Sequence, residues 1–240
     1  KNKPKNIIAV TGTNGIGKST LISDMLETWA SYETPSTSFR DDIDDKYITD
    51  VTEDRQRAIL DSMVTQLKTY GKSDSVLYDR CPVDNMVYTL YGYAKEEGDI
   101  TEEFVLECAA ELKIALRMID LILFIPITKQ DNVNIEANLE DKGDLDLAYA
   151  KEIDHIFKSI YREWDKRGSP YVDFEDKPHV IEIFGTPEER LELMKMYIDT
   201  TGDAYGEGLI IKPDELEGLH HMDALLAEQE GLAEDAKLEL

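Results

Sequence analysis

The stretch "GTNGIGKST" at residues 12–20 constrains the fold of this chain more than any other feature. It follows a short apolar run, "NIIAVTG" at residues 6–12, and precedes a segment with apolar residues at helical spacing. Its three glycines let the backbone curl so that successive N–H groups point inward at an anion, which side chains would obstruct. A helix beginning at about Lys18 would direct its N-terminal dipole at the same point. We therefore expect a buried strand, an anion-binding loop and a helix in direct succession.

The same stretch matches the pattern G-x-x-x-x-G-K-[ST] in full, in the strand–loop–helix context that such a loop requires. In this pattern Lys18 reaches the β- and γ-phosphates of a nucleoside triphosphate, and the hydroxyl of Ser19 ligates Mg²⁺. A glycine-rich turn that matches by chance is the alternative interpretation. We predict that the chain binds ATP and Mg²⁺, and that the cofactor-binding residues are Gly12, Thr13, Asn14, Gly15, Ile16, Gly17, Lys18, Ser19 and Thr20.

Apolar stretches alternate with helical patterns along the first 200 residues. This alternation predicts an α/β fold, a three-layer, doubly wound parallel sheet of about five strands with helices on both faces, as in P-loop NTPases. The polar segment at about 127–148 is a lid-like loop in this scheme. The predicted strands lie at residues 6–12, 35–39, 75–78, 121–127 and 179–185, and the predicted helices at about 18–30, 52–70, 82–91, 101–119, 146–166 and 186–200.

The chain is strongly acidic, with 51 Asp and Glu against 26 Lys and Arg and a formal net charge of −25. Such a surface repels phosphate backbones, which argues against broad binding to nucleic acid. A small phosphorylated ligand needs only a few well-placed cations and remains compatible with this charge.

The final segment, residues 201–240, holds eleven acidic residues against two lysines. It is either a solvated acidic extension or a weak amphipathic helix that packs on a neighbour, which would include a second subunit in a homodimer. Two cysteines are too few for a disulfide framework, so we expect a reducing, cytoplasmic setting. No apolar run is long enough to span a membrane, and the one at the start is too short for a signal peptide.

A second unusual stretch is "SVLYDRCPVDN" at residues 75–85, where a buried strand runs directly into Asp79 and Arg80. Charges at the end of an apolar strand are costly unless something there needs them. Ligands of open α/β sheets bind at the carboxyl ends of the strands, which is where this pair would lie. The chain shows neither the guanine-reading N-K-x-D of GTPases nor an apolar strand that ends in Asp-Glu. These features favour phosphoryl transfer to a bound acceptor over attack by water.

With these two motifs the chain resembles the P-loop nucleoside and nucleotide kinases, in particular the thymidylate kinase and deoxynucleoside kinase group. It is also similar to phage and bacterial P-loop kinase-like proteins that carry a DR-x-P-x-D segment. The resemblance is specific at "GTNGIGKST" and "YDRCPVD" and weaker at "SFRDD" and "FGTPEER". It implies an ATP- and Mg²⁺-dependent phosphotransferase that acts on a nucleoside or nucleotide.

The resemblance implies that Asp79 holds Mg²⁺ or its water, or accepts a proton, and that Arg80 contacts the acceptor or its phosphate. It also implies that Arg40 holds an acceptor phosphate and that Asp41 or Asp42 orients or deprotonates an acceptor hydroxyl. The structural alternatives are a strand-end salt bridge or helix cap for the first pair and a solvated charged loop for the second group.

Further acceptor contacts are implied for Asp84, which would line the pocket, and for Tyr88, which would stack on a base together with Tyr78 or Tyr91. A helix N-terminal Asp needs no function, and such tyrosines are more often core residues. The resemblance also places backbone under the adenine, at Gly185, Thr186 and Pro187.

One departure from the group concerns its lid, which usually carries arginines that close over the transferring phosphoryl group. Here the chain has no arginine between Arg117 and Arg162. Either Arg162 or Arg167 moves into the site, or a lysine replaces the missing arginine, or the lid is organised differently. The candidate lysines are Lys129, Lys142 and Lys151.

Two other functions remain open on the sequence. One is a kinase for a hydroxyl on a modified base or an end within a polynucleotide. The other is a nucleotide-bound regulatory or assembly ATPase, in which the acidic tail binds the partner.

Overall fold

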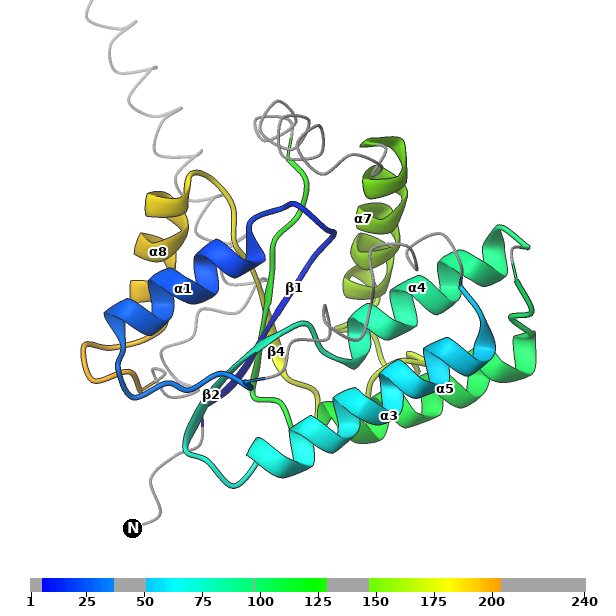
Figure 1. Ribbon diagram of the computed structural model, residues 1–240, viewed down its shortest axis with the longest axis horizontal. Coiled ribbons are helices and arrows are strands. Elements are labelled where there is room, and N and C mark those ends of the chain that lie inside the picture. Colours follow the sequence, from blue (N-terminus) through cyan, green and yellow to red (C-terminus); the bar gives the residue numbers. More distant parts are fainter. Residues whose placement is uncertain (1–5, 37–50, 97, 129–146, 204–240) are drawn as a thin grey trace, which may run out of the picture.

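The computed structural model describes residues 6–36, 51–96, 98–128 and 147–203. Its centre is a parallel sheet in which the strands follow the order β2-β1-β3-β4 (Figure 1). Parallel strands require crossover connections, and helices supply them here. The strands are β1 (Asn6–Thr11), β2 (Ser75–Asp79), β3 (Leu121–Phe124) and β4 (His179–Glu182).

Helices cover both faces of this sheet, which confirms the predicted three-layer α/β architecture (Figure 1). α1 and α8 pack together on one face, and α3, α4, α5 and α7 form the layer on the other. The helices are α1 (Lys18–Thr28), α3 (Glu53–Tyr70), α4 (Pro82–Ala94), α5 (Glu102–Leu116), α7 (Leu147–Arg162) and α8 (Pro187–Lys195).

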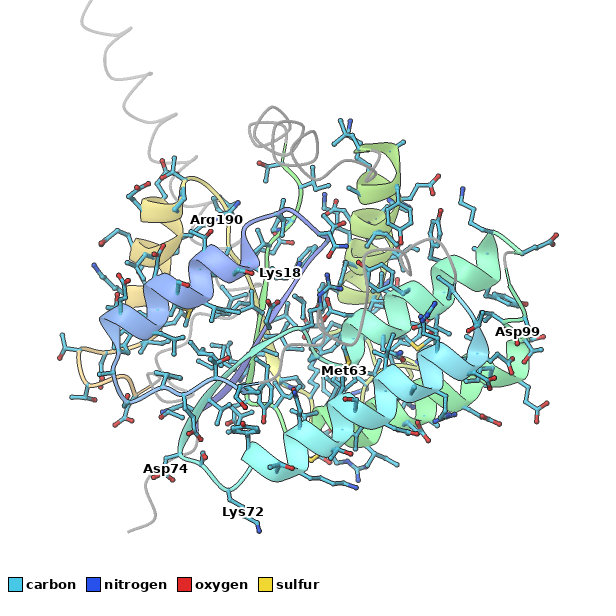
Figure 2. The ribbon with its side chains drawn as sticks, in the orientation of Figure 1. Lys18, Met63, Lys72, Asp74, Asp99 and Arg190 are labelled. Atoms are coloured by element: carbon cyan, nitrogen blue, oxygen red, sulfur yellow. The ribbon has the colours of Figure 1, made fainter. Side chains whose placement is uncertain are left out.

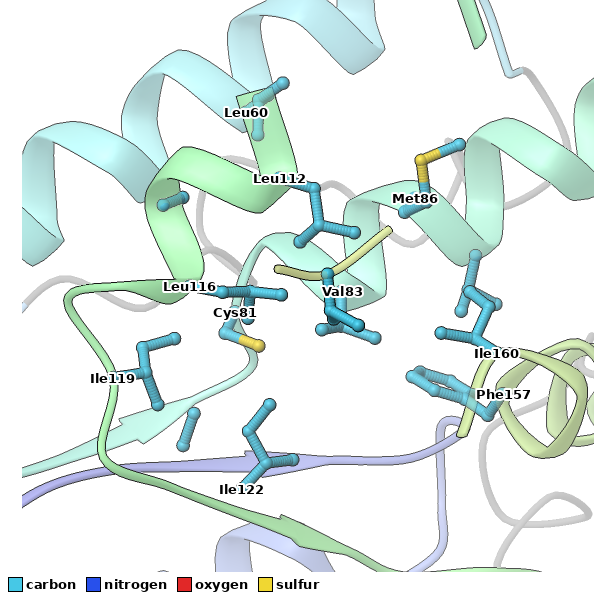
Figure 3. Close-up of a cluster of buried hydrophobic side chains, with 14 of the residues drawn as sticks. Leu60, Cys81, Val83, Met86, Leu112, Leu116, Ile119, Ile122, Phe157 and Ile160 are labelled. Atoms are coloured by element: carbon cyan, nitrogen blue, oxygen red, sulfur yellow. The ribbon is translucent and has the colours of Figure 1, made fainter. Parts of the chain in front are cut away.

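The two layers of helices enclose two hydrophobic cores, because successive side chains of a strand point to opposite faces. On β1, Ile8 and Val10 join the core beneath α1 and α8, whereas Ile7 and Ala9 join the core beneath the other four helices. All six residues of β1 are buried, as expected for the central strand of a parallel sheet. Figure 3 shows the larger core, where Leu112 of α5 meets side chains of the neighbouring helices.

Threonine caps begin three of the helices. The side chain of Thr101 accepts a hydrogen bond from the backbone N–H of Phe104 at 3.2 Å and so caps α5. Thr52 and Thr186 cap α3 and α8 in the same way. Each cap satisfies one of the backbone N–H groups that a helix leaves without an internal partner.

The edge of the sheet beside β2 differs from the prediction. The described residues of the expected strand at 35–39 are Pro35 and Ser36, and neither is in a strand. Instead, Glu33 forms an isolated parallel bridge with Val76. Proline has no backbone N–H to continue such a ladder, which accounts for its end before Pro35. The described sheet therefore has four strands, and residues 37–39 lie outside the described part of the chain.

The described chain ends at Asp203, where it contacts the far end of α1. The indole N–H of Trp29 donates to the backbone oxygen of Asp199 at 2.9 Å, and the hydroxyl of Tyr32 donates to that of Gly202 at 2.8 Å. α8 stops at Lys195 rather than near residue 200 because the chain turns to make these contacts. Most of the predicted lid-like loop and of the acidic tail, residues 129–146 and 204–240, lies outside the described residues. None of the described helices is long and apolar enough to cross a membrane.

Two leucines of α5 test the position of the larger core. Leu112 is 1% exposed and Leu106 is 61% exposed on the same helix. We expect Leu112→Ala to lower the free energy of unfolding by about 2–5 kcal/mol, because it leaves a cavity in the core. The matched control Leu106→Ala should change it by less than about 0.5 kcal/mol. Urea unfolding of both variants measures this difference, and equal effects would contradict the assignment of these faces.

Candidate active site

The phosphate-binding loop has the conformation that its glycines predict. Gly12, Gly15 and Gly17 have φ angles of 147°, 75° and 99°, in the region that side chains disfavour. A Cβ atom on Gly12 would lie 2.8 Å from the backbone oxygen of Ile125, which β3 places beside the loop. The loop therefore needs glycine both for its backbone angles and for its close packing on the sheet.

The first turn of α1 is left open to an anion. Its N-cap is Gly17, which has no side chain to accept a hydrogen bond, and its first turn has no acidic residue. By contrast, α3, α5 and α8 each have a threonine cap and two acidic residues in the first turn. Because a helix N-terminus attracts negative charge, this difference fits the binding of phosphate groups at α1.

Lys18 places its ammonium group within the loop. Its Nζ donates to the backbone oxygens of Gly12 at 2.8 Å and Thr13 at 2.7 Å, and the residue is 1% exposed. Figure 2 shows Lys18 at the start of α1. This buried cation fits the predicted role toward triphosphate oxygens. Ser19 and Thr20 follow it on the exposed side of the helix.

The strand pairing brings the second motif to the same place. Asp79, which is half-buried, lies opposite Val10 in the register of β1 and β2. The backbone N–H of Arg80 then donates to the oxygen of Val10 at 2.9 Å, and the Arg80 guanidinium donates to the side-chain oxygen of Asn14 in the loop. The two motifs that the sequence singled out therefore meet at the carboxyl edge of the sheet.

Arg80 has an unusual backbone. Its φ angle of 78° lies in the left-handed region, which is uncommon for residues other than glycine. Such conformations persist only where the surroundings enforce them, and they are frequent at functional sites. Here the angle turns the chain sharply from β2 into α4 and directs the side chain toward the loop.

Buried polar groups surround the guanidinium of Arg80. Asp84 is 1% exposed, and one of its carboxylate oxygens accepts the backbone N–H of Cys81 at 2.9 Å. Its other oxygen and the Nε of Arg80 have no hydrogen-bond partner among the described residues. The ring of Tyr88 lies under the guanidinium at 5.8 Å. Unsatisfied buried groups are costly, so this arrangement suits a polar ligand that would complete their hydrogen bonds.

The charges of this cluster depend on one another. Burial raises the pKa of Asp84 from 3.8 to about 6, against the opposing effect of Arg80 and Lys18. Burial disfavours the charged form of Arg80 and would lower its pKa. The electrostatic effect of Tyr88, Asp84 and Asp79 is larger, so the pKa of Arg80 is raised overall. Arg80 therefore stays cationic, while Asp84 changes charge near neutral pH.

Cys81 is a packing residue. It is 2% exposed and begins α4 as part of a capping box with Asp84. Burial raises the pKa of its thiol, so the reactive thiolate is disfavoured.

A magnesium site would depend on the nucleotide as well as on the protein. Among the described residues there is no group of three or more His, Cys, Asp or Glu side chains that would hold a metal ion. Mg²⁺ is commonly bound by one or two protein oxygens together with phosphates and water. Ser19 and Asp79, which the sequence predicts as ligands, have the oxygen chemistry that this arrangement requires.

Other predicted residues stay unassigned or have structural roles. Arg40, Asp41 and Asp42 lie outside the described residues. Gly185, Thr186 and Pro187 form the turn and cap that begin α8. Tyr78 is 2% exposed in the core, and Tyr91 packs edge-to-face on Tyr149 with ring centroids 5.0 Å apart.

Of the two arginines suggested for the lid, Arg167 lies in the segment that follows α7 and leads to the start of β4. Trp164 marks this position, because its indole N–H donates to the backbone oxygen of Pro178 at 2.9 Å, next to β4. Arg167 stacks on Phe174 in the same loop, at 4.4 Å. Lys151, in the first turns of α7, is the one of the three candidate lysines that lies in the described part of the chain.

One residue of the site was not predicted. Arg190 of α8 is 7% exposed, and its guanidinium donates to the backbone oxygen of Ile16 at 2.7 Å. No local sequence pattern indicates this contact, because the two residues are 174 positions apart.

Comparison with known families agrees with this geometry. The sequence profile of an AAA domain family, AAA_28, matches residues 7–178. The chain belongs to this family. No curated protein matches the chain by sequence.

Solved structures give the same fold. Deoxyadenosine kinase from M. mycoides with the products dCMP and dCDP bound has a TM-score of 0.59 at 14% identity, over 78% of this chain and 95% of that chain. The same enzyme with bound dATP has a TM-score of 0.56 at 15% identity, over 78% and 96%. NadR protein in complex with NR has a TM-score of 0.55 at 17% identity, over 85% of this chain and 54% of that chain. The match to NadR thus spans about half of that protein. These likenesses confirm the resemblance to P-loop nucleoside kinases at the level of the fold.

The raised pKa of Asp84 predicts a dependence of stability on pH. Between its unfolded value near 3.8 and its folded value of about 6, the folded state keeps a proton that the unfolded chain has released. This contribution to stability is present at low pH and is lost as the pH rises through about 6. We expect wild type to lose about 1 kcal/mol relative to Asp84→Asn between about pH 5 and pH 8.

Urea unfolding of both proteins across this range measures the effect. Asp61→Asn, on the exposed side of α3, is the control and should follow the wild-type profile. Parallel profiles for wild type and Asp84→Asn would contradict the assignment.

Proposed function

We propose that this chain is a P-loop kinase that transfers the γ-phosphoryl group of ATP, with Mg²⁺, to a nucleoside or nucleotide. The observation that carries the proposal is the Asp79–Arg80 pair at the end of β2, joined to the phosphate-binding loop through Arg80 and Asn14. An arginine directed at the loop from a neighbouring strand is placed to contact both the transferring phosphate and a bound acceptor.

On the donor side, the loop and the open N-terminus of α1 would hold the phosphates. Lys18 would place its charge on the β- and γ-phosphate oxygens, and Ser19 and Asp79 would hold Mg²⁺. When bound, Mg²⁺ supplies neutralisation of the charge that develops on the transferring group. Because phosphoryl transfer involves little covalent chemistry with the protein, positioning and charge neutralisation account for most of the catalysis.

On the acceptor side, Arg80 and Asp84 would contact the substrate. The planar guanidinium of Arg80 suits a pair of phosphate or hydroxyl oxygens. The free oxygen of Asp84 would accept a hydrogen bond from an acceptor hydroxyl, and Tyr88 would line the pocket beside it. Asp79 or Asp41 would be the group that orients or deprotonates the attacking hydroxyl.

The ligands of the similar structures support a nucleoside or nucleotide acceptor. Deoxyadenosine kinase from M. mycoides is described with dCMP, dCDP and dATP, and NadR with NR. We extend this ligand class to the present chain on the basis of the shared fold and the cluster around Arg80.

A transfer screen with labelled ATP tests the proposal. The acceptors are ribonucleosides, deoxynucleosides, their monophosphates and oligonucleotides with free 5′ ends. We expect at least one nucleoside or monophosphate to be labelled. Labelling of oligonucleotides alone would replace the proposal with a polynucleotide kinase, and acceptor-independent turnover alone would favour a regulatory ATPase.

Replacement of Lys18 tests the donor side. We expect Lys18→Ala to reduce phosphoryl transfer by at least about 100-fold, because it removes the buried charge that stabilises the transferring group. Lys195→Ala, which changes a partly exposed lysine of α8, is the control and should keep wild-type transfer. Transfer by Lys18→Ala at the wild-type rate would refute this role.

Replacement of Arg80 separates the acceptor side from the donor side. We expect Arg80→Ala to raise the KM for the acceptor by about tenfold or more, since a hydrogen-bonded charge is worth about 1.5–3 kcal/mol. The dissociation constant for ATP should change much less. Arg167→Ala, in the segment between α7 and β4, should leave both constants unchanged. An unchanged acceptor KM in Arg80→Ala would show that Arg80 does not hold the acceptor.

A further inference from the structure

We propose that Arg190 of α8 is a positioning residue of the phosphate-binding loop, which fixes the peptide group between Ile16 and Gly17 for the donor phosphates. The proposal rests on the binding of a triphosphate by this loop, as proposed above. It adds to the loop motif a residue that lies outside it, on the last described helix.

The contact itself is short and buried. The Nη1 of Arg190 donates to the backbone oxygen of Ile16 at 2.7 Å, and the side chain is 7% exposed. Figure 2 shows Arg190 between α8 and the start of α1. The two helices pack on each other along the same face of the sheet, so the contact forms part of a fixed interface.

This hydrogen bond determines the direction of a backbone N–H. All peptide bonds of the described chain are trans, so the C=O of Ile16 and the N–H of Gly17 point in opposite directions within their peptide plane. Because Arg190 holds the C=O toward α8, the N–H of Gly17 points away from α8. An anion-binding loop needs its N–H groups on that side, where they face the phosphates.

The loop is also shaped around Arg190. A Cβ atom on Gly17 would lie only 2.7 Å from the Nη1 of Arg190, and the φ angle of Gly17 is 99°. A side chain at this position would displace the guanidinium as well as strain the backbone. Gly17 thus serves the contact with Arg190 in addition to the curvature of the loop.

The charge of Arg190 adds to this effect. Arginine remains protonated at any physiological pH. The attraction between its charge and a phosphate is stronger in a buried site than in water. Lys18 already places one buried charge in the loop, and Arg190 places a second beside Gly17 from the α8 side. A lysine would keep the charge but lacks the planar geometry that fixes the peptide group.

Equilibrium binding to the full chain tests the proposal with MgATP, ADP, inorganic tripolyphosphate and adenosine as ligands. We expect Arg190→Met to weaken binding of the three phosphate-containing ligands about tenfold each, as expected for loss of a charged hydrogen bond, with adenosine unaffected. Arg190→Lys should recover part of this loss. Lys195→Met, on the same helix, is the matched control and should bind all four ligands as wild type does.

Kinetics separate positioning from a general structural role. The KM for ATP should rise in Arg190→Met while the KM for the acceptor stays within about twofold of wild type. Wild-type affinity for tripolyphosphate in Arg190→Met, or an equal loss of donor and acceptor binding, would overturn the proposal. If Arg190→Met does not fold, Arg190→Gln decides by the same criteria.

A wild-type chain that binds tripolyphosphate but phosphorylates no acceptor would refute the kinase function, while the binding comparison still decides the role of Arg190. A wild-type chain that binds neither ATP nor tripolyphosphate would refute both.

Discussion

The parallel pairing of β1 with β2 determines the geometry of the site. Both strands end at the same edge of the sheet, and the register that sets Val10 opposite Asp79 brings the next residue, Arg80, level with the phosphate-binding loop. The left-handed backbone of Arg80 then directs its side chain to Asn14. Burial of an arginine at the end of an apolar strand is costly, and the carboxylates of Asp79 and Asp84 offset that cost. The charged pair is therefore explained by its neighbours rather than by the strand that carries it.

Two kinds of N-terminus occur among the helices α1, α3, α5 and α8. Those of α3, α5 and α8 are closed by a threonine cap and by acidic residues, which satisfy the exposed N–H groups and the dipole within the chain. The N-terminus of α1 has a glycine cap and no acid, so an external anion would take that place. α8 contributes to both ends: Thr186 caps its own N-terminus, and its Arg190 donates a hydrogen bond to the backbone of Ile16, just before the N-terminus of α1.

The sequence predicted the features that depend on local pattern. The conformation of the glycine-rich loop and the end of β2 at Asp79 follow from residues within a few positions of one another, and the structure confirms both. The contact of Arg190 with the loop was not predicted, because no local signal distinguishes a buried arginine from an exposed one on a helix. The bridge at Glu33 was not predicted, because the strand at this edge was expected at residues 35–39. The acceptor residues at 40–42 remain predictions.

The fate of the γ-phosphoryl group tests the central claim most directly. A single-turnover reaction of γ-labelled ATP with the acceptor in excess shows whether the label moves to the acceptor or to water. The account predicts that label appears on the acceptor in equal amount to the ADP formed, and that little inorganic phosphate is released. Release of the label as inorganic phosphate, at the same rate with and without acceptor, would contradict it.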